Sequence, residues 1–248
     1  MTLNEFWKEN PSAALGFSGG VDSAYLLYSG LAAGARVGAY YIATAFQPGT
    51  ELEGARRLAE SLGVPLRVVE ADILTLPEVA RNPPDRCCHC KRALFSLIAA
   101  RAAEDGFALV IDGTNASDDF ESRPGMRALR ELGVRSPLRE CGLAKSEIRR
   151  LSRLAGLPTW DKPSNSCLAT RLQTGVPITP EALARVESAE AILHEMGFTN
   201  LRVRIRGENA VIQLPEVQLE RVLAIKDKII KRLKPGFGAV MLDLEGRE

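Results

Sequence analysis

The sequence predicts an α/β protein in which a doubly wound parallel sheet is followed by a small C-terminal α+β domain. Three observations support this fold. Up to about residue 160, apolar runs alternate with segments of helical periodicity. A glycine-rich hexapeptide joins the first apolar run to the next helix, and a proline-rich segment separates this part from the rest. We therefore expect one domain over residues 1–160 and a second over residues 161–248.

The bulk composition is that of a globular protein with a sizeable core. The 248 residues are 46% hydrophobic and 25% charged, and 32 lysines and arginines against 31 aspartates and glutamates leave a net charge of +1. This balance gives no argument for nucleic acid or a membrane surface as a partner. The sequence has no apolar run of about 18 residues and no signal-peptide pattern at its N-terminus, so we expect a cytoplasmic protein.

The first domain is expected to contain four strands and four main helices. The expected strands are residues 13–18, 36–45, 66–71 and 107–114, and the expected helices are residues 23–34, 49–63, 91–106 and 144–156. Gly34, Gly63 and Gly106 end three of these helices, as glycine commonly does. Strands that alternate with helices form parallel sheets, which bind ligands at the carboxyl ends of the strands.

The second domain is expected to begin with an irregular segment. Residues 158–180 are rich in proline and small polar residues, which is typical of a linker or an ordered functional loop. The elements expected after it are a helix over 181–197, a hairpin over 201–215 that turns at 207–209, a helix over 216–234 and a strand over 237–246.

The hexapeptide Ser-Gly-Gly-Val-Asp-Ser at residues 18–23 lies between the first strand and the first of these helices. Gly19 and Gly20 let the backbone approach a ligand closely, and the helix that follows offers unpaired N–H groups to an anion. Ser18 and Ser23 add hydroxyl donors, and Asp22 is placed to hold Mg²⁺ against a phosphate oxygen. The alternative is a tight turn in which Ser23 caps the helix.

A second polar loop follows the fourth strand and is expected at the same edge of the sheet. Asp112, Asn115, Asp118 and Asp119 in this loop are candidates to orient Mg²⁺ or a ribose. The alternative is a solvated loop of turn-forming aspartate and asparagine.

Three of the five cysteines, Cys87, Cys88 and Cys90, lie within four residues. A disulfide framework spreads its cysteines along the chain, so this clustering favours metal or sulfur chemistry in a reducing compartment. The next helix is expected to start at Lys91, and thiols before a helix N-terminus beside basic residues have a lowered pKa. The x₂ spacing of Cys87 and Cys90 lets two sulfurs chelate one metal centre.

Three interpretations of this cluster stay open. Zinc would need more ligands, for which His89 is available. Cys87, Cys90 and Cys167 would instead suit a [4Fe–4S] cluster with one open iron. The third interpretation is reactive surface thiols without a metal. Cys167 lies in the polar proline-rich segment with Arg171 close by, which favours an accessible thiolate over a buried small hydrophobe.

Arg202, Arg204 and Arg206 alternate along the first strand of the expected hairpin, so all three project from one face. This face is either a phosphate cradle, because arginine matches phosphate oxygens in pairs, or a solvent-exposed face. Glu190 falls at an ordinary exposed position of the preceding helix by its periodicity.

The hexapeptide resembles the SGGxDS signature of the PP-loop ATP pyrophosphatases, which cleave ATP between its α and β phosphates. Most of the chain resembles one branch of that superfamily, the LarE family of ATP-dependent sulfur transferases. The matching stretches are GFSGGVDSAYLL, RCCHCKRALF, DGTNASDD, RPGMRAL, KSEIRRLSRLAGLPTWDKPSNSCLATR, SAEAILHEMGF and LRVRIRG. The resemblance implies a PP-loop domain over 1–160 and a sulfur-transfer and substrate-phosphate domain over 161–248.

The activity that this resemblance implies belongs to the biosynthesis of the nickel-pincer nucleotide. A carboxylate of a pyridinium dicarboxylic acid mononucleotide is adenylylated with release of pyrophosphate, and sulfur then converts it to a thiocarboxylate. The implied cofactors are ATP, Mg²⁺ and a [4Fe–4S] cluster. The implied partners are the small nucleotide substrate, a sulfide or sulfur donor and further copies of the chain, with no nucleic acid and no membrane.

The resemblance also assigns roles to single residues. Gly113 joins the hexapeptide residues in the ATP site, Arg202 and Arg204 bind the substrate phosphate, and Glu190 is placed near the sulfur site as a base. The cysteine matching Cys167 is either sacrificed, which leaves dehydroalanine, or retained as a cluster ligand. Because this chain carries Cys87 and Cys90 as well as Cys167, we expect the cluster version.

Rival functions remain open on the sequence alone. A PP-loop tRNA thiolation enzyme also combines a C-x-x-C pair with a distant cysteine, but the near-neutral charge and the lack of a basic–aromatic stripe argue against it. A nitrogen-transferring PP-loop enzyme would use ammonia and would tolerate the loss of Cys167. A non-catalytic ATP-sensing or cluster-storage module would release no pyrophosphate.

Overall fold

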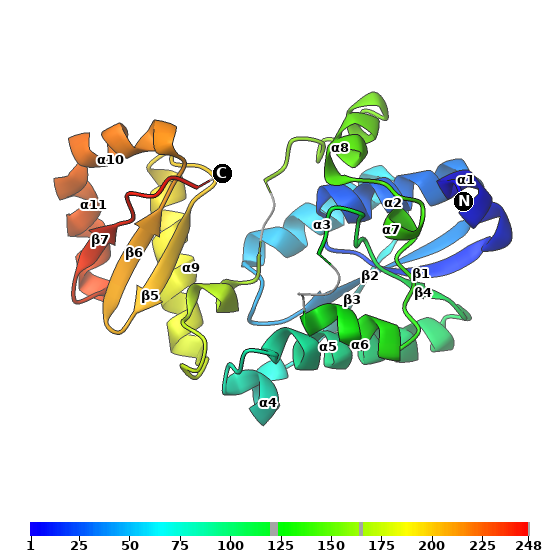
Figure 1. Ribbon diagram of the computed structural model, residues 1–248, viewed down its shortest axis with the longest axis horizontal. Helices are drawn as coiled ribbons and strands as arrows, with labels where there is room; N and C mark the ends of the chain where they lie inside the picture. The colour runs from blue at the N-terminus through cyan, green and yellow to red at the C-terminus, as the bar shows by residue number, and fades with distance from the viewer. Residues whose placement is uncertain (120–123, 164–165, 248) are drawn as a thin grey trace. The chain divides into compact units, whose positions relative to one another are not determined.

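The computed structural model describes residues 1–119, 124–163 and 166–247 of the chain (Figure 1). Residues 120–123 and 164–165, which belong to two of the motifs above, lie outside the described residues. The chain forms two compact units. The first unit comprises Met1–Val79 and Pro84–Asn165, and the second comprises Ala80–Pro83 and Ser166–Glu248.

The first unit is built on a parallel sheet with the strand order β3-β2-β1-β4. Its strands are β1 (Ser12–Gly16), β2 (Arg36–Ala43), β3 (Leu66–Glu70) and β4 (Val110–Ile111). The chain moves outward from β1 to β3 and then returns to the other side of β1 as β4. The strand order therefore reverses between β1 and β4, where sheets of this kind form a ligand-binding crevice at their carboxyl ends. This topology confirms the predicted fold class.

Helices cover both faces of this sheet (Figure 1). The helices over residues 1–165 are α1 (Leu3–Glu9), α2 (Val21–Ala32), α3 (Gly49–Ser61), η1 (Ile73–Thr75), α4 (Pro77–Ala80), α5 (Arg86–Glu104), α6 (Pro124–Glu131), α7 (Pro137–Glu140) and α8 (Lys145–Leu154). Successive residues of a strand point to opposite faces of the sheet. Ala13 and Leu15 pack into the core beneath α2 and α3, whereas Ala14 packs with Tyr40 and Ile98 beneath α5.

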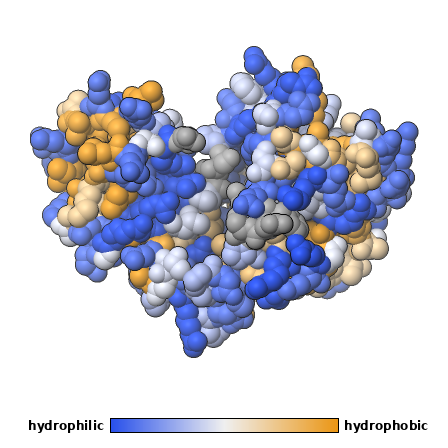
Figure 2. Space-filling model, viewed as in Figure 1, coloured by the Kyte–Doolittle hydropathy of each residue, from blue (hydrophilic) through white to orange (hydrophobic). Residues whose placement is uncertain are grey.

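The second unit contains a mixed sheet with the strand order β5-β6-β7. Strand β5 (Arg202–Arg206) runs antiparallel to β6 (Asn209–Gln213), which is parallel to β7 (Val240–Leu242). The helices are η2 (Leu168–Arg171), α9 (Pro180–Glu195), η3 (Glu216–Gln218), α10 (Leu219–Ala224), α11 (Lys226–Leu233) and η4 (Lys234–Gly236). Figure 2 shows apolar surface over α10 and α11, where Leu223 and Ile230 are exposed.

Two sequence predictions about helices are wrong. The helix expected over 216–234 is divided, because Ile225 adopts a φ of −119° between α10 and α11, outside the helical range. The helix expected to start at Lys91 starts at Arg86, so the clustered cysteines lie inside its first turns. No helix among the described residues has the length and apolar character needed to span a membrane.

Candidate active site

The hexapeptide loop is held in close contact with a neighbouring helix. It connects β1 to α2, and Gly19 has a φ of +69°, a conformation that favours glycine. A Cβ atom at Gly19 would lie 3.0 Å from both Cα and Cβ of Ala55 on α3. Gly19 therefore permits both the backbone conformation and the close packing of the loop on α3.

The N-terminus of α2 is left without a side-chain cap. Gly20 occupies the N-cap position and supplies no side-chain hydrogen bond to the helix. Its N–H donates to Ser18 Oγ at 3.3 Å, and Ser23 Oγ lies 3.2 Å from Ser18 Oγ. A helix of twelve residues with an uncapped N-terminus, two serine hydroxyls and a glycine loop offers donors to an anion.

The loop after β4 packs directly against this helix N-terminus. A Cβ atom at Gly113 would lie 3.1 Å from the backbone nitrogen of Ser23 and 3.4 Å from its Cα. The neighbouring Asp112 is buried, and its carboxylate accepts hydrogen bonds from Ser136 Oγ at 2.6 Å and from the backbone N–H of Thr114 at 3.2 Å. Asp112 therefore orders this loop, and Gly113 brings it against α2.

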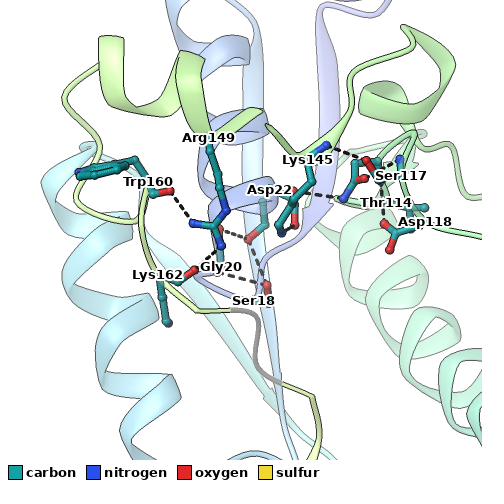
Figure 3. A network of polar contacts seen from close by, with 12 residues as sticks. Ser18, Gly20, Asp22, Thr114, Ser117, Asp118, Lys145, Arg149, Trp160 and Lys162 are labelled. Carbon is teal, nitrogen blue, oxygen red and sulfur yellow. Dashed lines mark hydrogen bonds and ion pairs between the residues drawn. The ribbon is translucent and has the colours of Figure 1, made fainter. Parts of the chain in front are cut away.

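Asp22 is the centre of a polar network at the same sheet edge (Figure 3). Lys145 Nζ forms an ion pair with its carboxylate, and Asn115 Nδ2 donates to its other oxygen at 3.3 Å. The loop is braced further, because Lys145 N donates to Ser117 Oγ at 2.9 Å and Asn115 N donates to Asp118 Oδ2 at 3.0 Å. A Mg²⁺ ion at Asp22 would have to displace the Lys145 ammonium, and the role of Asp22 as a Mg²⁺ ligand stays a prediction.

Lys162, in the segment after α8, contacts the hexapeptide. Its Nζ donates to the carbonyl oxygen of Gly19 at 3.3 Å and pairs with Glu51 at 2.9 Å. Arg149 fixes the backbone of this segment by donating to the carbonyl oxygens of Trp160 at 2.6 Å and Lys162 at 2.8 Å. The segment therefore presents a lysine cation beside the glycine loop.

A pocket of about 460 Å³ opens beside Gly19. Its lining is Gly19, Thr50, Glu51, Gly54, Arg57, Leu58, Ser61, Pro158, Thr159 and Lys162. Thr159 is 7% exposed, and its hydroxyl has no hydrogen-bond partner among the described residues. An unpaired buried hydroxyl is unfavourable, so this pocket wall is suited to a polar ligand.

Cys88 lies on a different side of α5 from Cys87 and Cys90. Cys88 is fully buried, Cys87 is exposed and Cys90 is half-buried. Because the helix begins at Arg86 rather than Lys91, the x₂ spacing of Cys87 and Cys90 brings both to one side of the helix. Arg86 Nη2 lies 3.6 Å from Cys87 Sγ.

The predicted cluster ligands are divided between the two units, with Cys87 and Cys90 in the first and Cys167 in the second. Within the described ranges, no group of three or more His, Cys, Asp or Glu side chains is arranged to hold a metal ion. The set of Cys87, Cys90 and Cys167 as cluster ligands stays a prediction.

Cys167 is half-buried and occupies the N-cap of η2. Its carbonyl oxygen accepts hydrogen bonds from the backbone N–H of Thr170 at 3.0 Å and from Thr170 Oγ1 at 2.8 Å. Arg171 Nη1 donates to the same oxygen at 3.2 Å. The backbone at Cys167 is therefore well fixed.

The expectation that Glu190 is an exposed helix residue is wrong. Glu190 is 7% exposed, and its carboxylate forms a two-point ion pair with Arg171, with distances of 2.8 Å from Nε and 3.1 Å from Nη2. The backbone N–H of Val203 donates to the same carboxylate at 3.0 Å. Burial is tolerated because both oxygens are hydrogen bonded and the charge is paired. The role of Glu190 as a base stays a prediction.

Arginines of the second unit form a cluster with an excess of positive charge. Burial, followed by the charge of Arg247, lowers the pKa of Arg202 to about 10. Burial also lowers the pKa of Arg204 and of Arg247. Arg204 donates to the carbonyl oxygen of Thr170 at 2.9 Å, whereas Arg206 at the end of β5 is exposed. Half-buried guanidinium groups that depress one another's pKa are typical of an anion site.

Comparison with known proteins finds relatives that are similar to this chain over almost its whole length. An uncharacterized protein of Synechocystis sp. is 37% identical over 252 residues, covering 98% of this chain and 92% of its own. A pyridinium-3,5-bisthiocarboxylic acid mononucleotide synthase of Lactiplantibacillus plantarum is 33% identical over 248 residues, with 99% and 90% covered. An uncharacterized protein of Methanocaldococcus jannaschii is 30% identical over 244 residues, with 98% and 93% covered. No family model matches the chain.

Sequence reasoning did not single out Lys145, Lys162 or the Arg171–Glu190 pair. The two lysines lie within a stretch that resembles the LarE family, but no spacing rule links them to the hexapeptide more than 100 residues earlier. In the sequence, Arg171 is visible only as a basic neighbour of Cys167. Its pairing with Glu190, 19 residues later, depends on the tertiary packing of η2 against α9.

Proposed function

The chain belongs to the LarE family, and we propose that it is an ATP-dependent sulfur transferase of nickel-pincer nucleotide biosynthesis. It adenylylates a carboxylate of a pyridinium dicarboxylic acid mononucleotide, which releases pyrophosphate, and then converts that carboxylate to a thiocarboxylate. The near full-length similarity to the Lactiplantibacillus plantarum synthase carries this proposal.

The first unit is proposed to bind ATP through the hexapeptide. Ser18, Ser23 and the uncapped N-terminus of α2 donate to the phosphate oxygens, and Gly19 and Gly20 allow the close backbone approach. Gly113 keeps the second loop against the same helix turn. The Lys162 ammonium beside Gly19 supports this assignment, because it adds charge where pyrophosphate would leave.

The family implies ATP use, and ATP normally arrives with Mg²⁺ bound to its phosphates. We propose that Mg²⁺ binds at the carboxylate of Asp22 only after the Lys145 ammonium has moved away from it. Replacement of Lys145 by methionine should then raise the apparent Mg²⁺ affinity in the presence of ATP. An unchanged affinity would exclude Asp22 as the ligand.

The second unit is proposed to bind the phosphate of the nucleotide substrate. Arg202 and Arg204 are half-buried and lie in a cluster with surplus positive charge, which supports this role. Arg247 contributes to the same positive field, as the depressed pKa of Arg202 indicates. A phosphate dianion would offset this repulsion.

The sulfur is proposed to come from one of two sources. In the first, the Cys167 thiolate attacks the acyl adenylate and AMP leaves; a base then removes the Cα proton, and the Cβ–S bond breaks to leave dehydroalanine and the thiocarboxylate. In the second, Cys87, Cys90 and Cys167 would hold a [4Fe–4S] cluster, which when bound supplies an open iron for a hydrosulfide. The presence of all three cysteines favours the second source.

Anaerobic purification followed by iron and sulfide analysis separates the two sources. Four irons per chain and an unchanged protein mass after turnover support the cluster. Loss of one H₂S from the Cys167 peptide supports the sacrificial route. Substitution of Cys88 by alanine is the matched control, because this neighbouring thiol is fully buried and should not affect iron content.

The substrate class is tested by incubating the protein with ATP and each candidate acceptor. The proposal predicts pyrophosphate release and a thiocarboxylate product with the pyridinium nucleotide, and no product with tRNA or with ammonia. Thiolated tRNA or an amide product would replace the proposal with one of the rival functions.

Self-association of the chain is also proposed. The exposed apolar side chains of α10 and α11 support it. Light scattering would measure the oligomeric state.

A further inference from the structure

The buried ion pair of the second unit joins three elements to the segment that carries Cys167. Arg171 is the last residue of η2, Glu190 lies in the middle of α9, and Val203 belongs to β5. The side chains of Arg171 and Glu190 are 5% and 10% exposed. The guanidinium Nε and Nη2 donate to the Glu190 carboxylate, which also accepts from the backbone N–H of Val203. The pair is therefore fixed to both the helix and the sheet.

The remaining guanidinium nitrogen holds the backbone on both sides of the Cys167 peptide bond. Arg171 Nη1 lies 2.7 Å from the carbonyl oxygen of Ser166 and 3.2 Å from that of Cys167. It also lies 2.7 Å from Ser166 Oγ and 3.2 Å from Thr170 Oγ1. One edge of the guanidinium thus donates to Glu190, and the Nη1 group donates to the turn that begins at Cys167.

This arrangement is unsuited to a base at Glu190. A general base must reach the proton that it takes, and its carboxylate must be able to accept that proton. Both oxygens of Glu190 already accept hydrogen bonds from Arg171, and one also accepts from Val203 N. If the carboxylate turned towards a substrate, the ion pair would break and leave the Arg171 guanidinium buried without its counter-charge, which is strongly unfavourable.

We propose that Arg171 and Glu190 are positioning residues, which together fix the backbone and hence the sulfur position of Cys167. The inference rests on the proposed function, in which Cys167 handles the transferred sulfur. Glu190 acts through Arg171 and takes no proton during the reaction. Arg171 can play this role because its planar guanidinium donates to Glu190 and to the Cys167 segment at the same time. A lysine ammonium cannot reproduce this geometry.

The test uses Arg171→Lys and Glu190→Gln in the full-length protein. The rate at which iodoacetamide alkylates Cys167 is followed on the Cys167 peptide by mass spectrometry, without ATP or substrate. We expect both variants to change this rate by about tenfold, because each loses a charge-assisted hydrogen bond. The double variant should change it no more than either single variant, since the two residues act as one unit.

Glu195→Gln is the matched control. Glu195 lies on the same helix α9 and pairs with Arg232 at 2.6 Å, but its side chain is 62% exposed. This variant should leave the alkylation rate unchanged. Circular dichroism compares the fold of all variants, and should Arg171→Lys fail to fold, Glu190→Gln and Glu190→Asp decide the proposal by the same alkylation assay.

The pH profile of sulfur transfer separates positioning from base catalysis. The proposal predicts that Glu190→Gln lowers the rate at every pH and keeps the shape of the wild-type profile. Loss of the acidic limb of the profile in this variant, with an unchanged alkylation rate, would overturn it. If the wild-type protein made no thiocarboxylate, the proposed function would fail, but the alkylation assay would still decide whether the pair positions Cys167.

Discussion

Substitution of Gly19 by alanine tests how the hexapeptide loop is held. Gly19 has a φ of +69°, and an L-residue in this region is destabilised by about 1–2 kcal/mol. The new Cβ atom would also lie 3.0 Å from the Cα and Cβ of Ala55, a contact that α3 can relieve only by moving its backbone. Overpacking of this kind costs about 1–3 kcal/mol. The two effects together predict a loss of about 2–5 kcal/mol in the free energy of unfolding.

Gly63→Ala is the matched control for this variant. Gly63 has a φ of +70°, but a Cβ atom there would meet no atom within 4 Å. It should therefore lose only the backbone contribution of about 1–2 kcal/mol and keep its affinity for ATP. Urea unfolding gives the stabilities, and titration calorimetry gives the ATP affinities. Equal stability losses and equal ATP affinities for the two variants would refute the close packing of the loop on α3.

The further predictions concern three side chains, Lys162, Arg202 and Cys88. Lys162→Met should lower ATP affinity by about tenfold, because it removes the cation beside Gly19; calorimetry that found wild-type affinity would exclude this role. Arg202→Met should raise the KM for the nucleotide substrate by about tenfold or more, whereas Arg206→Met, at an exposed position, should leave it unchanged. Because the pKa of Arg202 is lowered to about 10, its charge is present at neutral pH and lost as pH rises through that value, so phosphate affinity should fall there. Cys88→Ala should destabilise the first unit by about 1 kcal/mol in urea unfolding yet retain sulfur transfer, and a loss of transfer at wild-type stability would count against a purely structural Cys88.

The sequence was most informative where the chemistry is local. The hexapeptide between β1 and α2 and the alternation of strands and helices predicted the fold class and the position of the phosphate loop. Both depend on residues adjacent in the chain, whose periodicity and glycine content are visible in the sequence.

Long-range packing explains what the sequence did not predict. Glu190 looks like an exposed helix residue until Arg171 and the N–H of Val203 are brought to it by the fold. The start of α5 at Arg86 has a sequence signal in Asp85, a residue type favoured at helix N-caps, although its side chain makes no capping hydrogen bond. The break at Ile225 has no such signal, because no glycine or proline marks it.

The proposed reaction activates a carboxylate with ATP in one step and transfers sulfur in another. Pyrophosphate and thiocarboxylate are measured together, in the wild-type protein and in Cys167→Ser, with ATP and the pyridinium dicarboxylate mononucleotide. This two-step reaction predicts equal amounts of both products for the wild type, and pyrophosphate without thiocarboxylate for the variant. Thiocarboxylate formation by Cys167→Ser at the wild-type level, or a wild-type protein that releases no pyrophosphate, would contradict it.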